Sequence, residues 1–206
     1  MITIIDSGVA NIGSVMAACH RIGAAAQVTT DPAVVRSAGA LILPGVGAFA
    51  DGMASLRKHR LEQPIREAAA AGVPILGICL GMQLLAEISE EFGEHGGLGL
   101  ISGRVMRLQP ADSERVPNIG WWDISIAKNA RLFAGIEDGS AFYFVHSYYL
   151  SCTDTQDSVA SIAFGSGAVT IAIERGNIFG VQFHPEKSQD LGLQLLDNFA
   201  RFSRTI

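Results

Sequence analysis

The amino-acid sequence predicts an α/β fold: a single flavodoxin-like, doubly wound domain with a mixed, mainly parallel sheet. Two observations indicate it. Apolar strand-like runs alternate with helical segments through the first half, which is the order that builds parallel sheets. Only 17% of the 206 residues are charged and the mean hydropathy is +0.30, as expected for strands that are covered on both faces. Without an internal repeat or linker, residues 1–206 are expected to form one domain.

The first half carries clear start and stop signals for its helices. Asn11 or Ser14 can cap a helix that ends before Gly23, and Asp31 followed by Pro32 opens another. Strands are predicted at residues 2–5, 27–29, 40–43 and 75–78, and helices from 11 or 14 to 22, from 31, and at 50–59, 64–71 and 80–88.

The second half changes character after a glycine-rich stretch at residues 90–102, which is predicted to be a loop. Short strands and one closing helix are then expected. The strands are predicted at residues 104–108, 121–126, 142–145, 158–163, 169–173 and 178–183, and the helix at 189–204.

Composition excludes several classes of function. A net charge of −5 gives no basic footprint for nucleic acid, and no apolar run reaches the length of a membrane span. The opening segment reads as a strand and lacks the features of a signal peptide, so a cytoplasmic protein is expected. The three cysteines (Cys19, Cys79 and Cys152) are scattered, which argues against a disulfide framework and a zinc site. Neither a metal nor a cofactor is predicted.

Cys79 carries the strongest chemical signal in the chain. It follows an apolar run and lies between Gly77 and Gly81, immediately before a helical segment. This strand, sharp turn and helix are typical of a nucleophile elbow, here with sulfur in place of the usual serine oxygen. The helix N-terminus would favour the thiolate. A lone cysteine in an apolar run is more often a buried core residue, but the two glycines favour the nucleophile.

A base for this nucleophile is predicted at His184, where another apolar run ends. Glu186 is two positions further on, so in an extended chain both side chains would point the same way. Glu186 could then hold the imidazole in one tautomer while the other ring nitrogen faces sulfur. The carboxyl ends of parallel strands meet at one edge of a sheet, so His184 and Cys79 are expected to meet there. A surface turn with a His–Glu pair is the alternative.

An oxyanion hole is predicted from two segments. The stretch Pro44-Gly-Val-Gly47 follows a strand, and its glycines would let a backbone N–H near Val46 and Gly47 turn into the site. The N–H of Leu80, directly after the nucleophile, would be the second donor. Taken alone, such a stretch is more often an ordinary turn.

Together these motifs resemble the class I (triad) glutamine amidotransferases. The resemblance is carried by Gly-Ile-Cys-Leu-Gly-Met-Gln83, the later His184-Pro-Glu and the upstream Pro44-Gly-Val-Gly, and it covers nearly the whole chain. The four-residue Pro44-Gly-Val-Gly47 is most similar to the glutaminase subunits of imidazole glycerol phosphate synthase, and so are the stretches at 11–15, 120–121, 143–148 and 184–188. Residues 1–206 would then be one glutamine amidotransferase type 1 domain.

The resemblance implies a role for each matching residue. Cys79 would be the nucleophile, His184 the general base and acid, and Glu186 its orienter. Gln83 would contact the substrate glutamine, and Gly47 would line the same pocket. His146, Ser147 and Tyr148 are the remaining residues expected to bind substrate. From its apolar and aromatic neighbours alone, His146 reads as a satisfied core or interface histidine and not as a second base.

The resemblance also implies a partner. Ammonia would pass through a channel into a (β/α)₈ barrel cyclase subunit, which makes imidazole glycerol phosphate and an aminoimidazole carboxamide ribotide in histidine biosynthesis. Asn11, Trp121 and Lys187 resemble residues that face this partner in the heterodimer. Because adjacent side chains cannot share a strand face, Trp121 or Trp122 is expected to point outward, which suits a docking surface.

Some positions differ from the family. Its usual Pro-His-Met-Gly-Trp-Asn is here Pro117-Asn-Ile-Gly-Trp-Trp122, toward the partner face. A paralogue that feeds ammonia to another acceptor, for example for sugar amidation, would change there first and stays an alternative. Three further alternatives stay open. They are the glutaminases of the pyridoxal phosphate and anthranilate pathways, a cysteine hydrolase of similar elbow architecture, and a non-catalytic docking subunit.

Overall fold

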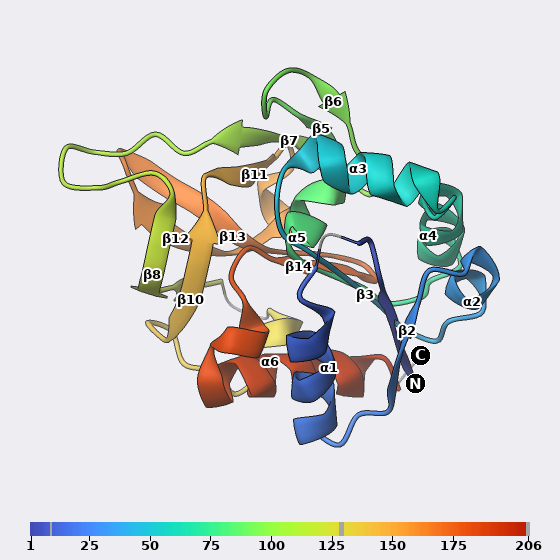
Figure 1. Cartoon of the computed structure of the whole chain (residues 1–206). Coiled ribbons are helices and arrows are strands. Elements are labelled where there is room, and N and C mark those ends of the chain that lie inside the picture. Colours follow the sequence, from blue (N-terminus) through green and yellow to red (C-terminus); the bar gives the residue numbers. More distant parts are fainter. Residues whose placement is uncertain (9, 128–129, 205–206) are drawn as a thin grey trace.

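The computed structural model describes residues 1–8, 10–127 and 130–204. Its centre is an eight-stranded sheet with the order β2-β1-β3-β4-β14-β13-β12-β9 (Figure 1). The strands are β1 (Ile2–Ile5), β2 (Ala26–Thr29), β3 (Leu41–Gly45), β4 (Ile75–Cys79), β9 (Ser125–Ile126), β12 (Ser158–Phe164), β13 (Gly167–Arg175) and β14 (Ile178–Val181).

The five strands from β2 to β14 pair in parallel, whereas β13, β12 and β9 continue the sheet with antiparallel pairs. The parallel part has the order of a flavodoxin-like, doubly wound fold. The predicted mixed, mainly parallel sheet is therefore confirmed.

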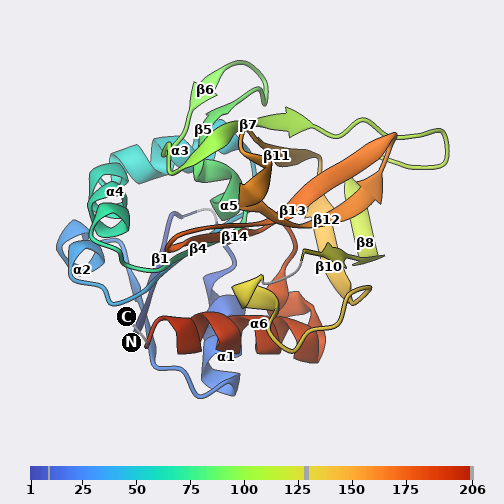
Figure 2. The ribbon, with the colours of Figure 1, turned by 180° about the vertical axis from the view of Figure 1, so that it is seen from behind.

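Helices cover both faces of this sheet (Figures 1 and 2). On one face α1 and α6 pack together, and on the other face lie α2, α3 and α4. The helices are α1 (Ile12–Arg21), α2 (Pro32–Arg36), α3 (Phe49–Lys58), α4 (Glu62–Ala70), α5 (Leu80–Leu84) and α6 (Gln189–Phe202). Each face buries its own apolar core, which is why the parallel strands β1, β3 and β4 are buried along their whole length. None of the described helices is both long and apolar enough to cross a membrane.

The second half of the chain adds two smaller sheets. One pairs β8 (Asn118–Asp123) with β10 (Ala141–His146), and the other has the order β11-β7-β5-β6. Its strands are β5 (Ala86–Ser89), β6 (His95–Gly96), β7 (Ile101–Arg107) and β11 (Tyr148–Cys152). Three short 3₁₀ turns complete the described structure: η1 (Arg131–Phe133), η2 (Thr155–Asp157) and η3 (Pro185–Lys187).

The helix predicted at residues 80–88 is wrong in its second half. It ends at Leu84, and β5 follows because Ala86 and Ser89 are buried while the strand pairs in parallel with β7. The loop predicted at 90–102 contains β6 and the start of β7, and the strand predicted at 121–126 is two strands in different sheets. Strands β6 and β9 have only two residues each and β5 has four, so their strand character depends on pairing with other segments and not on a local pattern.

Candidate active site

The sharp turn at Cys79 joins β4 directly to α5, as predicted. Cys79 has φ 54° and ψ −113°, which is strained for a residue with a side chain. Helix α5 turns back so closely that a Cβ atom at Gly77 would lie 2.7 Å from the backbone of Gly81. A Cβ at Gly81 would overlap the carbonyl of Leu43 in β3. The two glycines therefore permit the elbow, and Cys79 stands at the carboxyl end of the parallel sheet.

His184 and Glu186 form the predicted pair, but not in an extended chain. They lie around η3, with Pro185 at its first position, and His184 Nδ1 is 2.7 Å from Glu186 Oε1. Both side chains are buried, at 5% and 2% exposure. Burial alone would lower the pKa of His184, but its interactions with Cys79 and Glu186 raise it from 6.5 to about 9. The imidazole is therefore charged at neutral pH and suited to stabilise a thiolate.

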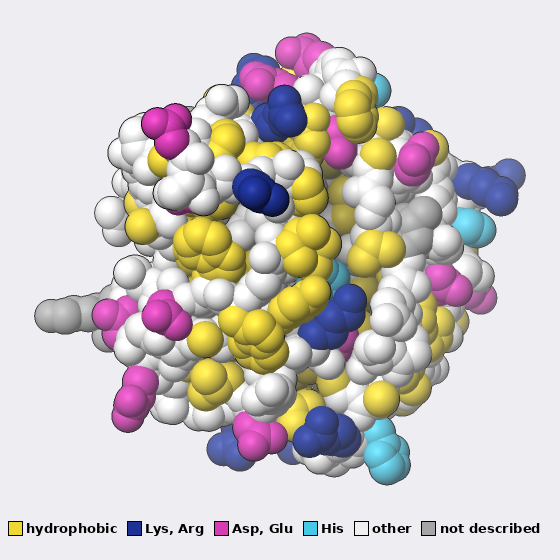
Figure 3. Space-filling view, turned by 60° about the vertical axis from the view of Figure 1, so that its left-hand side comes forward, with side chains coloured by type: hydrophobic (Ala, Val, Ile, Leu, Met, Phe, Trp, Pro, Cys, Tyr) yellow, Lys and Arg dark blue, Asp and Glu magenta, His cyan; other side chains and the backbone are white. Residues whose placement is uncertain are grey.

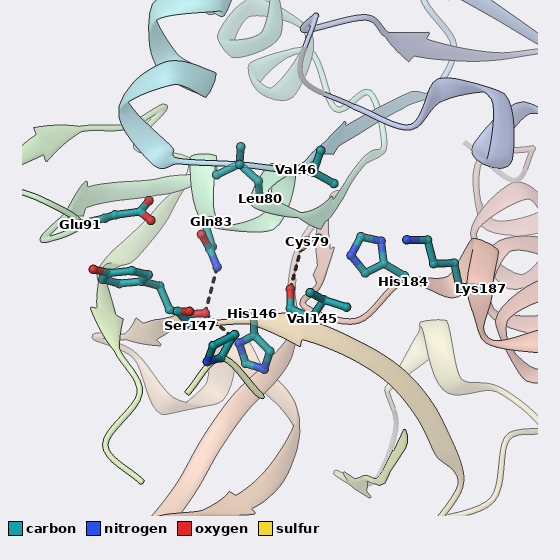
Figure 4. Close-up of a pocket in the computed structure, with 13 residues that line it drawn as sticks. Val46, Cys79, Leu80, Gln83, Glu91, Val145, His146, Ser147, His184 and Lys187 are labelled. Atoms are coloured by element: carbon teal, nitrogen blue, oxygen red, sulfur yellow. Dashed lines mark hydrogen bonds between the residues drawn. The ribbon is translucent and has the colours of Figure 1, made fainter. Parts of the chain in front are cut away.

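A pocket of about 290 Å³ brings most of the predicted site residues together (Figure 4). The predicted residues that line it are Val46, Gly47, Cys79, Leu80, Gln83, His146, Ser147, Tyr148, His184 and Lys187. Gly47 has φ 103°, a left-handed conformation that glycine tolerates best. Figure 4 shows Gln83 and Cys79 in the middle of the pocket, between Glu91 on one side and His184 with Lys187 on the other.

Gln83 has both hydrogens of its side-chain amide in use. Its Nε2 donates to the Tyr148 carbonyl at 3.0 Å and to Gln182 Oε1 at 2.9 Å. The side chain is buried and ties α5 to the start of β11. Gln83 thus holds the pocket wall in place, besides lining the pocket itself.

His146 is a satisfied buried histidine that also lines the pocket. Its Nδ1 lies 2.8 Å from the Tyr148 carbonyl, and its Nε2 lies 3.1 Å from the side-chain nitrogen of Asn118. Burial lowers the pKa of His146 to about 4, so the ring is neutral near pH 7. A neutral ring with both nitrogens bonded supports the reading that His146 is not a second base.

Glu91 lines the pocket but is not among the residues that the sequence predicts there. Its Oε2 accepts from the Phe49 N–H at 2.6 Å, where α3 begins, and the residue is buried. Figure 4 shows Glu91 at one end of the pocket and His184 with Lys187 at the other. The sequence does show a carboxylate in the segment that follows the elbow helix, but no sequence pattern indicates that this carboxylate lies near Cys79.

The three residues expected to face a partner have different surroundings. Lys187 is exposed at the rim of the pocket. Trp121 is 48% exposed and packs its ring edge on Tyr143, whereas Trp122 packs on Phe164 at the core, so one Trp points outward as expected. Asn11 is exposed and caps α1, its side chain accepting from the backbone N–H at residue 14.

No cluster of metal-ligating side chains exists among the described residues. The arrangement instead offers a strained cysteine, a charged histidine and a buried carboxylate that orients it. This set of groups is suited to nucleophilic acyl transfer through a covalent thioester.

Comparison with known proteins agrees with this chemistry. The family model described as glutamine amidotransferase class-I matches residues 3–201. The chain is 48% identical over 203 residues to the imidazole glycerol phosphate synthase subunit HisH of Moorella thermoacetica, covering 98% of this chain and 95% of that protein. It is 46% identical to the protein of the same name from Syntrophotalea carbinolica, with 97% and 98% coverage.

Solved structures are similar in fold. A crystal structure of a glutamine amidotransferase superposes with a TM-score of 0.77 at 18% identity, covering 98% of each chain. The PurLQS structure from Thermotoga maritima gives 0.76 at 19% identity, covering 98% of this chain and 97% of the matched one. At this level of identity the likeness shows the fold alone.

Proposed function

This chain belongs to the class I glutamine amidotransferase family, and on that premise we propose that it is the glutamine-hydrolysing subunit of an imidazole glycerol phosphate synthase. The family resemblance drawn from its motifs is confirmed. The proposed reaction converts glutamine to glutamate and ammonia. A cyclase subunit would use the ammonia to make imidazole glycerol phosphate and an aminoimidazole carboxamide ribotide in histidine biosynthesis. A cytoplasmic location is part of the same proposal.

The single observation that best supports this chemistry is the placement of Cys79 and His184 in one pocket, with Glu186 behind the histidine. The Cys79 thiolate attacks the substrate carboxamide, and a C–S bond forms. Protonated His184 gives its proton to the nitrogen, so the C–N bond breaks and ammonia leaves. His184 then takes a proton from water, which attacks the thioester and releases glutamate and the thiolate.

The oxyanion of each tetrahedral intermediate would accept hydrogen bonds from backbone N–H groups. Leu80 opens α5, where the first N–H groups have no partner within the helix. The second donor is proposed near Val46 and Gly47, which line the pocket beside Cys79. Removing one such donor typically costs about 10²–10³ in rate.

The pocket also has a polarity that suits glutamine. With the substrate carboxamide at Cys79, the α-ammonium group would extend toward the Glu91 carboxylate at one end of the pocket (Figure 4). A buried carboxylate there can pair with a cation. Gln83 and residues 146–148 would form the wall along the substrate. We therefore add Glu91 to the proposed substrate-binding residues.

The proposed partner is a (β/α)₈ barrel cyclase that docks over the pocket mouth. Figure 3 shows hydrophobic side chains gathered around a hollow on the side of β8 and β10. We define the mouth face as Val46, Ile119, Trp121 and Val145, which are exposed apolar residues, together with Lys187. Ile119 lies opposite Val145 in the sheet, and Val46 and Val145 line the pocket, so the face is continuous with the site. Apolar patches of this kind are typical of interfaces.

Two measurements test the proposal. Cys79→Ala should abolish ammonia release from glutamine while the protein keeps its thermal unfolding temperature. The subunit mixed with a barrel cyclase should form a heterodimer and transfer the ammonia to the cyclase product. Substantial glutamine turnover by the Cys79→Ala protein would refute the nucleophile, and binding to a different acceptor enzyme would favour a paralogue.

A further inference from the structure

Gln182 is a fully buried residue outside the predicted triad, and it contacts the reacting sulfur. It lies directly after β14 and two residues before His184. Its side-chain Nε2 is 3.7 Å from Cys79 Sγ, and its Oε1 accepts from Gln83 Nε2 at 2.9 Å. Both ends of the Gln182 amide are therefore engaged, one of them by the nucleophile.

A backbone carbonyl fixes the direction of this hydrogen-bonded chain. The Tyr148 carbonyl can only accept, so Gln83 must present Nε2 to it. The same nitrogen also donates to Gln182, so Gln182 must accept with its Oε1. Its Nε2 then points toward the Cys79 sulfur. Turning either amide, or both, would set two acceptors or two donors against each other. The orientation of Gln182 thus follows from the network and does not depend on telling oxygen from nitrogen.

A side-chain N–H aimed at sulfur favours the form of sulfur that accepts best. The thiolate is a much stronger acceptor than the thiol, because hydrogen bonds to charged groups are about twice as strong as neutral ones. The thiol has its own acceptor, the Val145 carbonyl, but this contact is longer, at 4.0 Å. Of the two neighbours, Gln182 is closer and favours the charged sulfur.

We propose that Gln182 is a catalytic residue of the glutaminase reaction, whose amide donates to the Cys79 sulfur and stabilises it as the thiolate. In the first step it increases the fraction of sulfur ready to attack. In the second step sulfur leaves the thioester and regains its charge, so the same N–H stabilises the leaving group. Gln83 and the Tyr148 carbonyl act through Gln182 by holding its amide in the required direction. This inference rests on the proposed function.

The experiment measures the rate of Cys79 alkylation by iodoacetamide against pH, since alkylation reports the thiolate fraction without glutamine or a partner. Mass spectrometry of the Cys79 peptide separates it from Cys19 and Cys152, whose pKa values are raised by burial to about 11 and about 12. Replacing the donor by Gln182→Met should move the midpoint of the Cys79 profile up by about one pH unit. Once ionised, the carboxylate of Gln182→Glu keeps the shape but cannot donate and adds a like charge, so its midpoint should move at least as far.

A matched control is Asn177→Leu, which removes another side-chain amide that donates to two backbone carbonyls, those of Ala69 and Val73. It should lower the unfolding temperature but leave the Cys79 midpoint unchanged. If Gln182→Met does not fold, Gln182→Glu and Gln83→Met decide, because the latter removes the group that orients Gln182.

The outcomes separate this inference from the proposed function. An unchanged midpoint in folded Gln182 variants, while the wild-type protein hydrolyses glutamine and Cys79→Ala does not, would overturn the role of Gln182 alone. Glutamine hydrolysis by Cys79→Ala would overturn the proposed function. A shift confined to the Gln182 and Gln83 variants would support the inference.

Discussion

The side-chain nitrogen of Asn118 lies 3.1 Å from Nε2 of His146, and both side chains are buried. His146 uses Nδ1 to donate to the Tyr148 carbonyl, so its Nε2 must accept from Asn118. Asn118 is one of the positions at which the sequence differs from the usual family pattern. The pair thus holds the tautomer of a histidine in the pocket wall through a residue that departs from that usual pattern.

Asn118→Leu should lower the free energy of unfolding by about 1–2 kcal/mol, because it leaves His146 Nε2 as a buried acceptor without a donor. The loss is moderated because Asn118 Oδ1 is itself without a hydrogen-bond partner among the described residues. Urea denaturation measures the effect. The double variant Asn118→Leu/His146→Phe should cost less than the sum of the two single variants, and strict additivity would contradict the pairing.

The pKa shifts of His146 and His184 are opposite in direction, so they predict opposite dependences of stability on pH. The pKa of His146 falls from 6.5 to about 4 on folding, so between these values the unfolded chain binds a proton that the native state does not. Its contribution to stability is therefore lost as the pH falls through this window, by about 3 kcal/mol in all. The pKa of His184 is raised to about 9, so its contribution is complete below 6.5 and is lost as the pH rises through 9.

Thermal unfolding between pH 4.5 and 9.5 tests both directions. His146→Phe should flatten the acid side of the profile relative to wild type, and His184→Gln should flatten the alkaline side. The outcome that contradicts the assignment is a variant whose profile runs parallel to that of the wild type.

Glu186→Gln should lower kcat for glutamine hydrolysis by on the order of 10³, with little change in KM. The variant keeps the shape of the side chain but removes the charge that stabilises protonated His184 and fixes its ring. Steady-state ammonia release gives both constants. A kcat within twofold of wild type would show that His184 needs no orienting carboxylate.

Glu91→Gln should raise KM for glutamine by roughly 10–100-fold while kcat changes little, since in the proposed binding mode it removes a charge that would pair with the substrate in ground and transition states alike. The amide oxygen of Gln can still accept from Phe49, so α3 keeps its N-terminal contact. The matched control is Glu90→Gln, because Glu90 pairs with Arg104 on the surface. Equal effects of the two substitutions would remove Glu91 from the substrate site.

The elements that the sequence predicted well are those whose signals are local. The elbow at Cys79 needs Gly77 and Gly81 whatever surrounds it, and the alternation of strands and helices fixes the order of the parallel sheet. The apolar run that includes Ala86 and Ile88 predicts a helix over β5, because the pairing of β5 with β7 is not visible in the run itself. Local signals suffice for the elbow, whereas the side sheets depend on contacts between distant segments.

The same distinction between local signals and long-range contacts applies to the residues of the candidate site. Cys79, His184 and Glu186 follow from short motifs, and the structure brings the first two into one pocket. Glu91 and Gln182 were missed although both are buried beside that pocket. One sequence pattern could have indicated Gln182. Side chains alternate along an extended segment, which places Gln182 on the same side as His184. Glu91 carried only the signal of a carboxylate after the elbow helix, since its place at the pocket depends on its hydrogen bond to the start of α3.

Trp121→Ala should weaken binding of the barrel cyclase by on the order of tenfold to a hundredfold, because the Trp121 ring is the largest exposed apolar group of the mouth face. The ring packs on Tyr143 and not in the core, so the unfolding temperature of the isolated subunit should stay near that of wild type. Val28→Ala is the control, since Val28 is similarly exposed, at 41%, but lies in β2, an edge strand of the eight-stranded sheet, outside the mouth face. Titration calorimetry with the cyclase compares the three proteins. If Trp121→Ala binds as tightly as Val28→Ala, the mouth face is not the docking surface and the ammonia must leave by another route.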